Sequence, residues 1–301
     1  MKERIAQLKS KLSGGVAPAM ATPLQADGYS VNKEVIPQLV NFLIEKGASG
    51  LFVGGTTGEG VLLSLAERKI LHETAVSAAQ NRVPVLLHTG TNNLADTITL
   101  SLHAQEIGAD AIAVVTPFFY GMHDDGLAAY YTAIANAVSE IPLLLYDIPQ
   151  LAINGISPAL LARLGSELPS VAGVKCSRPD AQMIRQLIAA APEHTMVLAG
   201  NEAIALGSLA MGAHGVISGL STAVPEPFVA LTQAFAQGNL AEAQQIHNKI
   251  NQMLAQMPAG ARIGGIKQIL TERGIPMGTA VPPRPMPTEP IWPQLEMILN
   301  A

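Results

Sequence analysis

Three almost wholly apolar runs, VPVLL (83–87), AIAVV (111–115) and IPLLL (141–145), decide the fold of this chain. Each run is short, and each is followed by a longer amphipathic stretch. Continuous apolar runs of this length are typical of parallel strands that are buried on both faces of a sheet. The segment therefore indicates consecutive strand–helix units.

The same alternation extends outward from this segment in both directions and predicts eight strand–helix units. The predicted strands are 16–22, 50–53, 83–88, 111–115, 142–146, 171–175, 195–199 and 215–218. The predicted helices are 33–45, 65–79, 95–107, 126–138, 158–164, 181–190, 202–211 and 226–235. Eight such units in about 220 residues predict an α/β fold, a (β/α)8 TIM barrel, and favour it over an open, doubly wound sheet.

The alternation stops near residue 239. Residues 240–256, 263–273 and 290–299 are predicted to be helices, with a proline-rich loop at 281–293. We therefore expect two parts: a barrel over 1–238 that carries the active site, and a C-terminal helical appendage over 239–301. The appendage is expected to pack against the barrel or against another subunit.

Composition narrows the class of protein. Hydrophobic residues make up 49% of the chain and charged residues 14%, which is a globular composition. The net charge is −5 and no block of Lys and Arg stands out, so nucleic acid and anionic membrane are poor partner candidates. The N-terminus lacks the apolar core of a signal peptide, and no apolar run reaches the ~20 residues that span a bilayer. We therefore expect a cytoplasmic protein.

Lys175 is the last residue of the apolar run VAGVK (171–175). Active sites of (β/α)8 barrels lie at the carboxyl ends of the strands. Burial of a lysine is costly unless its charge is paired, and desolvation lowers its pKa. Since a neutral amine attacks a ketone to form an imine, we assign Lys175 as the candidate nucleophile. The alternative is a structural lysine that reaches the rim of the barrel.

Two further features fall at the same end of the barrel. Tyr146 ends the strand at 142–146, and its phenol can donate the proton that imine formation requires, although a half-buried rim tyrosine is the alternative. The loop GGTTGEG (54–60) follows the second strand. Its backbone N–H groups and the hydroxyls of Thr56 and Thr57 suit a carboxylate, although an ordinary turn has similar glycines.

The remaining polar candidates carry weaker signals. The seven histidines form no His-x-x-His or Glu-x-x-His cluster, so we expect no catalytic metal. His88, at the end of the third strand, is interpreted as a rim histidine. Cys176, the single cysteine, excludes a disulfide within the chain. Because it follows Lys175 on a strand, it should point away from the site.

Together, GGTTGEG, YDIP (146–149) and GVKCS (173–177) resemble, in order and context, the dihydrodipicolinate synthase / N-acetylneuraminate lyase family. The segments VVTPFFY (114–120) and GAHGVISG (212–219) match as well, and the resemblance covers nearly the whole chain. It implies a class I aldolase that joins a lysine to pyruvate or a related 2-oxo acid as an imine, with no other cofactor. Family members are commonly tetramers, which implies a homo-oligomer here.

The resemblance also implies roles for individual residues. Lys175 would form the Schiff base, Tyr146 would be the general acid/base, and Thr56 would relay protons to Tyr146. Thr57, with neighbouring backbone N–H groups including that of Gly58, would hold the pyruvate carboxylate. Two further residues would complete the site: Ile217 would line it through its backbone carbonyl, and Ser177 stands where relatives usually carry a threonine that meets substrate hydroxyls.

Departures from the family pattern bear on the second substrate. Dihydrodipicolinate synthases proper place an arginine two residues after the motif that corresponds to YDIP, where this chain has Leu151, which cannot pair with a carboxylate. Sialate lyases carry an Asp-Glu pair where this chain has Glu202 and Ala203, which disfavours a nine-carbon sialic acid. Relatives also place an aromatic hydroxyl, lent by a neighbouring subunit, in the segment that contains Phe118 and Phe119; here the hydroxyl comes one residue later. Three alternatives follow: the relay is broken, it runs through water, or it passes through Tyr120, the candidate relay residue.

We therefore expect a lyase that cleaves or forms a 2-keto-3-deoxy-type sugar acid or hydroxy acid. The runner-up is 4-hydroxy-tetrahydrodipicolinate synthase, which combines pyruvate with aspartate semialdehyde. There are two alternatives from other classes. One is a non-catalytic homologue that binds a keto acid as a sensor, and the other is a metal-dependent aldolase on the same fold.

Overall fold

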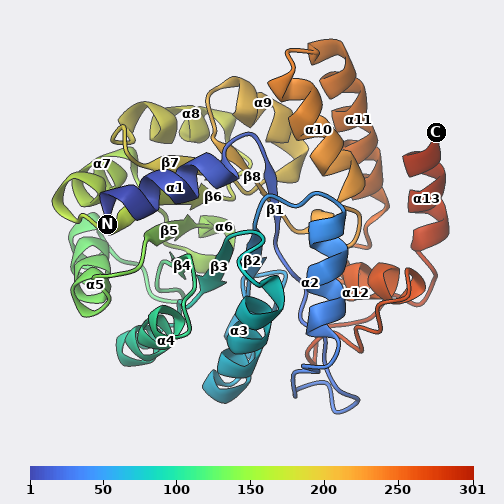
Figure 1. Ribbon diagram of the computed structural model, residues 1–301, viewed down its shortest axis with the longest axis horizontal. Helices are drawn as coiled ribbons and strands as arrows, with labels where there is room; N and C mark the ends of the chain where they lie inside the picture. Colours follow the sequence, from blue (N-terminus) through green and yellow to red (C-terminus); the bar gives the residue numbers. More distant parts are fainter.

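Eight parallel strands form a barrel in the computed structural model, which describes all 301 residues (Figure 1). Hydrogen-bonded neighbours follow the order β1-β8-β7-β6-β5-β4-β3-β2. Between β1 and β2 the barrel is bridged where Ala19 pairs with Phe52, and the Met20 N–H donates to the Phe52 carbonyl at 2.9 Å. The predicted (β/α)8 barrel is thus confirmed and the open sheet is wrong. The strands are β1 (Val16–Pro18), β2 (Leu51–Val53), β3 (Val85–His88), β4 (Ala111–Val115), β5 (Leu143–Asp147), β6 (Val171–Cys176), β7 (Met196–Ala199) and β8 (Gly215–Ser218).

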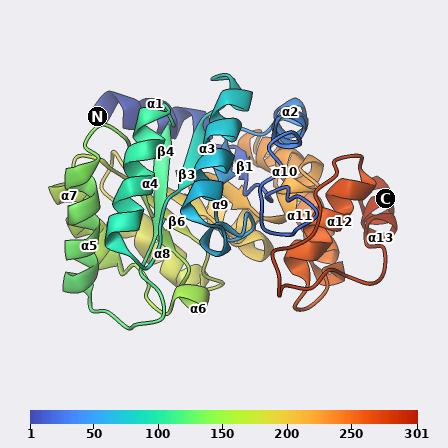
Figure 2. The ribbon, with the colours of Figure 1, turned by 90° about the horizontal axis from the view of Figure 1, so that it is seen from below.

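Helices cover the outside of the barrel between successive strands (Figures 1 and 2). Several begin where the sequence provides an N-cap: Ser64, Asn93 and Ser157 each accept backbone N–H groups of the first turn. The helices are α2 (Ile36–Glu45), α3 (Leu65–Ala79), α4 (Leu94–Glu106), α5 (Asp124–Ala137), the one-turn α6 (Pro149–Ala152), α7 (Pro158–Glu167), α8 (Ala181–Ala190), α9 (Ala205–Ala210) and α10 (Glu226–Ala236).

The first strand is shorter than the predicted 16–22. Pro18 has no N–H to continue the ladder, and beyond the bridge at Ala19 the chain leaves the sheet. Thr22 then reaches the loop after β2, where its hydroxyl donates to the Gly58 carbonyl at 2.6 Å. The predicted second half of this strand therefore serves as a support for the loop 54–60.

The apolar side chains divide into two cores. One lies between the strands and the surrounding helices, and includes Leu143 and Leu145 of β5. The other fills the barrel interior, and includes the alternate residues Leu144 and Tyr146. This alternation brings side chains at the carboxyl ends of the strands into the mouth of the barrel.

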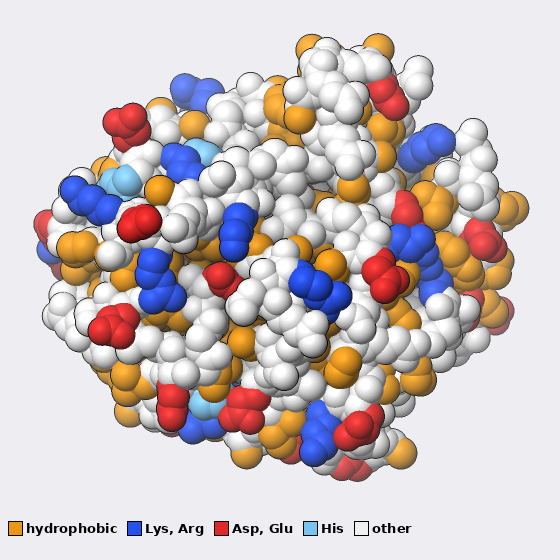
Figure 3. Space-filling model, in the orientation of Figure 1, with side chains coloured by type: hydrophobic (Ala, Val, Ile, Leu, Met, Phe, Trp, Pro, Cys, Tyr) orange, Lys and Arg blue, Asp and Glu red, His pale blue; other side chains and the backbone are white.

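An N-terminal helix, α1 (Lys2–Leu12), was not among the predicted elements. Its Ile5, Leu8 and Leu12 are buried in the interior core, so the helix closes one end of the barrel. Figure 2 shows α1 at one end of the barrel and α6 at the other. On the face that carries α1, acidic and basic side chains are interspersed (Figure 3). With this end closed, the open end lies at the carboxyl ends of the strands.

The C-terminal helices follow the barrel, as predicted, and are α11 (Leu240–Gln256), α12 (Arg262–Glu272) and α13 (Trp292–Asn300). They gather on one side of the molecule, next to α10 and α2 in Figure 1. Their apolar residues, such as Ile250, Ile266 and Leu295, join the core between barrel and helices. None of the helices combines the length and the hydropathy that a membrane crossing requires.

Candidate active site

The direction of Lys175 depends on an irregularity in β6. The pairing of β5 with β6 shifts between Leu143–Val171 and Leu144–Gly173, so β6 carries one extra residue. As a result, Ala172 and Lys175 both point into the barrel although they are three residues apart. Gly173 permits this bulge because its φ is 137° and a Cβ there would lie 1.9 Å from the Met196 carbonyl oxygen.

Lys175 is 3% exposed and has no carboxylate partner. Its Nζ lies 3.9 Å from the centroid of the Phe52 ring and 4.0 Å from that of Tyr146. Burial lowers the pKa of Lys175, while Tyr146 and Glu202 act in the opposite direction. The side chain is therefore held in surroundings that favour the neutral amine.

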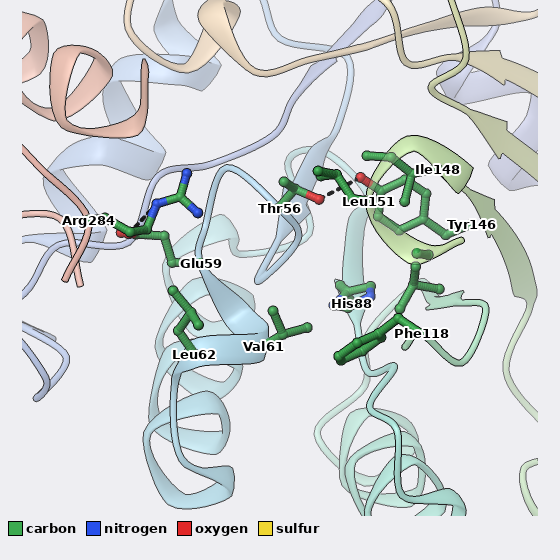
Figure 4. Close-up of a pocket in the computed structure, with 12 residues that line it drawn as sticks. Thr56, Glu59, Val61, Leu62, His88, Phe118, Tyr146, Ile148, Leu151 and Arg284 are labelled. Atoms are coloured by element: carbon green, nitrogen blue, oxygen red, sulfur yellow. Dashed lines mark hydrogen bonds and ion pairs between the residues drawn. The ribbon is translucent and has the colours of Figure 1, made fainter. Parts of the chain in front are cut away.

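Tyr146 stands next to Lys175 in the pairing of β5 with β6. Its hydroxyl lies 2.9 Å from the Thr56 hydroxyl, and the two face one another in Figure 4. The Tyr146 ring is fixed by edge contacts with Phe52 and His88, each at 5.7 Å between centroids. A phenol and an alcohol in contact can pass a proton between them, one donating as the other accepts.

The loop that carries Thr56 and Thr57 is tightly folded. A Cβ on Gly60 would lie 1.8 Å from the Gly54 carbonyl oxygen, and one on Gly58 would lie 2.8 Å from the Met20 carbonyl oxygen. Only glycine fits these two close backbone approaches. Next to them, Glu59 turns inward in the left-handed conformation, with φ of 57°. The loop therefore presents its two threonines at a fixed place.

A cavity of about 450 Å³ lies at the carboxyl ends of the strands and brings most of the predicted site residues together. Those that line it are Lys175, Tyr146, Thr56, Thr57, Ser177, Ile217 and Glu202. Two predicted residues do not reach it. Gly58 lies behind the loop surface, and Tyr120 is 72% exposed on the segment after β4. In this chain alone, Tyr120 has no contact with Tyr146 or Thr56.

The structure adds residues that the sequence interpretation did not assign. Arg262, at the start of α12, lines the cavity together with Leu254 of α11 and Asn201 after β7. Gln150 also lines it, and its Nε2 donates to the Ser177 carbonyl at 2.7 Å. No local pattern marks Arg262, because it begins a helix far along the chain from the barrel strands. The cavity is thus built from the barrel and from the C-terminal helices.

A second, smaller cavity of about 160 Å³ adjoins the first and shares Thr56, Tyr146, Ile148 and Leu151 with it (Figure 4). His88 lines this cavity and is 2% exposed. Burial, together with the nearby Arg68 guanidinium, holds the pKa of His88 well below its usual value. A neutral imidazole therefore packs against the Tyr146 ring.

Cys176 and Asp147 lie on the outer side of their strands. Cys176 belongs to the core between barrel and helices, as predicted, and burial raises the pKa of its thiol to about 12. Asp147 is fully buried and accepts from Arg178 Nε at 2.6 Å. These two side chains join the segments after β5 and β6 and do not line the cavity.

Comparison with known proteins gives one consistent result. The family model of the dihydrodipicolinate synthetase family matches residues 12–301. The chain is 36% identical over 266 residues to the 4-hydroxy-tetrahydrodipicolinate synthase of Listeria welshimeri, which covers 88% of this chain and 90% of that protein.

Two solved structures are similar over nearly their whole length. The sialic acid aldolase of Ruminococcus gnavus superposes with a TM-score of 0.91 at 29% identity, covering 96% of this chain and 98% of that one. YagE, an Escherichia coli K12 prophage protein of the dihydrodipicolinic acid synthase family solved with pyruvate, has a TM-score of 0.88 at 30% identity, with 95% and 97% covered.

Proposed function

Because the chain belongs to the dihydrodipicolinate synthetase family, we propose that it is a class I aldolase whose Lys175 forms an imine with pyruvate or a related 2-oxo acid. The observation that carries this proposal is the surroundings of Lys175. Its amine is buried without a carboxylate partner, at the base of a cavity, beside a tyrosine that contacts a threonine hydroxyl. No metal ion or organic cofactor takes part in the proposed chemistry.

Lys175, Tyr146 and Thr56 can together carry out imine formation and then carbon–carbon bond formation. The Lys175 amine adds to the C2 carbonyl of the oxo acid, and the resulting hydroxyl leaves as water after it accepts a proton from Tyr146. Thr56, 2.9 Å from the Tyr146 hydroxyl, relays the proton. The Tyr146 phenolate then accepts a proton from C3, which gives an enamine. The enamine C3 attacks an aldehyde to form the new carbon–carbon bond, and the aldehyde oxygen takes its proton from Tyr146. Cleavage is the reverse.

The loop 54–60 is the proposed carboxylate site. Thr57 is 8% exposed and lines the same cavity as Lys175, which supports a role for its hydroxyl and the neighbouring N–H groups in binding the oxo acid carboxylate. Backbone N–H groups in a tight glycine turn are suited to an anion. Ser177 and Ile217 line the cavity from β6 and β8 and complete the proposed binding site.

The aldehyde-derived part of the substrate would extend away from Lys175 toward Leu151, Gln150 and Glu202. Leu151 offers no charge to a second carboxylate, whereas Gln150, Ser177 and Glu202 offer hydrogen-bonding groups. This lining favours a 2-keto-3-deoxy-type sugar acid or hydroxy acid. The second candidate is 4-hydroxy-tetrahydrodipicolinate synthase, which the name of the Listeria relative favours.

Turnover with defined substrates tests the proposal. Release of pyruvate from short 2-keto-3-deoxy sugar acids is followed with lactate dehydrogenase and NADH, and condensation of pyruvate with aspartate semialdehyde is measured in parallel. We expect kcat for the preferred reaction to fall about 10²–10⁴-fold in Tyr146→Phe, because the proton donor is lost. Absence of turnover with every aldol substrate would contradict the proposal and favour a binding protein without activity.

The proposal includes a homo-oligomer. Exposed apolar side chains surround the mouth of the barrel: Val61 is 49% exposed, Leu62 46%, Phe119 73% and Ile153 62%. Exposed apolar surface of this kind marks a contact with another protein. A second copy of the chain over this surface would also cover Tyr120. Light scattering on the purified protein gives the mass, and a monomer at micromolar concentration would contradict this part of the proposal.

A further inference from the structure

One ion pair lies inside the cavity that contains Lys175. Arg262 Nη2 donates to Glu202 Oε2 at 2.5 Å, and both residues line the cavity. The Arg262 side chain is 38% exposed and that of Glu202 is 11% exposed. The pair joins α12 to the turn after β7 and lines the cavity together with Lys175.

Glu202 makes hydrogen bonds to other protein groups, whereas Arg262 makes none beyond the ion pair. Glu202 Oε1 accepts from the Ser218 hydroxyl at 2.9 Å and from the Leu220 N–H at 2.6 Å, which fixes the carboxylate in the wall. Glu202 Oε2 accepts only from Arg262 and has capacity for another donor. The guanidinium of Arg262 has no other protein partner, so most of its N–H donors face the cavity or solvent.

The charge of the pair decides what it recognises. Arg262 and Glu202 cancel one another, so this wall carries no net charge but presents donors and an acceptor side by side. A hydroxyl group can donate to Glu202 and accept from Arg262 at the same time. A carboxylate would gain from Arg262 but would be placed next to the Glu202 carboxylate, and like charges at close range disfavour binding.

We propose that the Arg262–Glu202 pair is a specificity determinant that selects a neutral, hydroxyl-bearing chain on the aldehyde side of the substrate and disfavours one that ends in a carboxylate. The inference rests on the proposed function, because it concerns the second substrate of the lysine imine. Gln150 and Asn201, which line the same cavity, carry neutral amides and extend the uncharged hydrogen-bonding surface.

The test compares two aldehydes in condensation with pyruvate: D-glyceraldehyde, which is neutral and hydroxylated, and succinic semialdehyde, which ends in a carboxylate. The quantity measured is the ratio of kcat/KM for succinic semialdehyde to that for D-glyceraldehyde. The variants are Glu202→Gln and Arg262→Leu. The matched control is Arg185→Leu, which removes an exposed arginine on α8 that does not line the cavity.

We expect the wild-type ratio to favour D-glyceraldehyde. Glu202→Gln leaves Arg262 without its counterion, so the ratio should rise by about tenfold. Arg262→Leu leaves the Glu202 charge uncompensated, so the ratio should fall, and kcat/KM for D-glyceraldehyde should fall about tenfold through the lost hydrogen bonds. Opposite shifts are expected only if the pair contacts the substrate. If the pair only held α12 against the barrel, each variant would lower kcat/KM for both aldehydes and leave their ratio unchanged.

Ratios that stay within twofold of the control in both variants would overturn the inference, as would a wild-type preference for succinic semialdehyde. Reduction of the wild-type protein with borohydride and pyruvate separates this failure from failure of the proposed function. A pyruvate adduct on wild-type Lys175 with unchanged ratios would contradict the specificity role alone. Absence of an adduct with pyruvate and also with longer 2-oxo acids would contradict the proposed function, and the inference would fall with it.

Discussion

Lys175 and Lys267 are both buried lysines, but they have opposite surroundings. Lys267, on α12, is fully buried, and its Nζ lies 2.7 Å from Glu59 Oε2 and 2.7 Å from the Thr279 carbonyl oxygen. Lys175 has two aromatic rings in place of a carboxylate. Burial lowers the pKa of both, but Glu59 opposes this effect at Lys267. Burial alone therefore does not identify a nucleophilic lysine. The absence of a carboxylate counterion distinguishes Lys175 from Lys267.

The ion pair of Lys267 is connected to the site that contains Lys175. Glu59 belongs to the loop 54–60, and its Oε1 accepts from the Val281 N–H at 3.0 Å, in the segment after α12. Arg284 Nε lies 3.5 Å from the same oxygen. The ion pair of Lys267 thus joins the C-terminal segment to the loop that carries Thr56 and Thr57. One lysine is placed to react, and the other fixes the loop beside it.

The largest effect on stability is expected at Lys267. Lys267→Met leaves the buried Glu59 carboxylate without its main counterion, which should lower the free energy of unfolding by about 3–5 kcal/mol. Urea denaturation followed by circular dichroism, at one protein concentration, measures this change. A decrease in the free energy of unfolding below about 1 kcal/mol, which is typical of exposed ion pairs, would contradict a Glu59–Lys267 ion pair that is shielded from solvent.

A double-mutant cycle sharpens this result. Glu59→Gln keeps an oxygen for the Val281 N–H but removes the charge. The double variant Glu59→Gln/Lys267→Met therefore contains no buried unpaired ion at this site, and Arg284, the remaining cation, is partly exposed to solvent. The coupling free energy between the two positions should be about 0.5–3 kcal/mol in the stabilising direction. Strict additivity of the two single changes would contradict the ion pair as the source of stability.

The smallest effect, and one of opposite sign, is expected at Lys175. Lys175→Met removes a buried amine that has no counterion, so it should raise the free energy of unfolding by about 1 kcal/mol at neutral pH while it abolishes turnover. A folded-state pKa that is lowered means that the unfolded state binds more protons. Wild-type stability should therefore rise relative to Lys175→Met as the pH increases toward the usual pKa of lysine. Urea denaturation at several pH values measures the difference in free energy of unfolding between Lys175→Met and the wild type. This difference should shrink as the pH rises, and a difference that grows with pH would contradict this account.

The barrel could be predicted from the sequence because its signal is local. Each buried parallel strand is a continuous apolar run, and each run is separated from the next by an amphipathic helix. Lys175 and Tyr146 were recognisable for the same reason, since a polar residue that ends an apolar run stands out. The helix α1 also carried a local signal, the stripe Ile5, Leu8 and Leu12, but its place across the end of the barrel depends on tertiary packing.

The remaining features depend on contacts between distant segments. The bulge at Gly173 that turns Lys175 inward follows from the pairing of β6 with its neighbours, and strict alternation from Ala172 would have turned Lys175 outward. Arg262 reaches the cavity because α12 packs beside the turn after β7. Tyr120, predicted as a relay, lies outside the cavity because the segment after β4 turns outward, with φ of 80° at Phe119.

The most direct test of the central claim is reduction of the protein with borohydride in the presence of pyruvate, followed by intact-protein and peptide mass spectrometry. We predict one reduced pyruvate adduct per chain, on Lys175, and none on Lys267, with no adduct in Lys175→Met. An adduct spread over exposed lysines, or no adduct on folded protein with either pyruvate or longer 2-oxo acids, would contradict the assignment of Lys175 as the imine-forming residue.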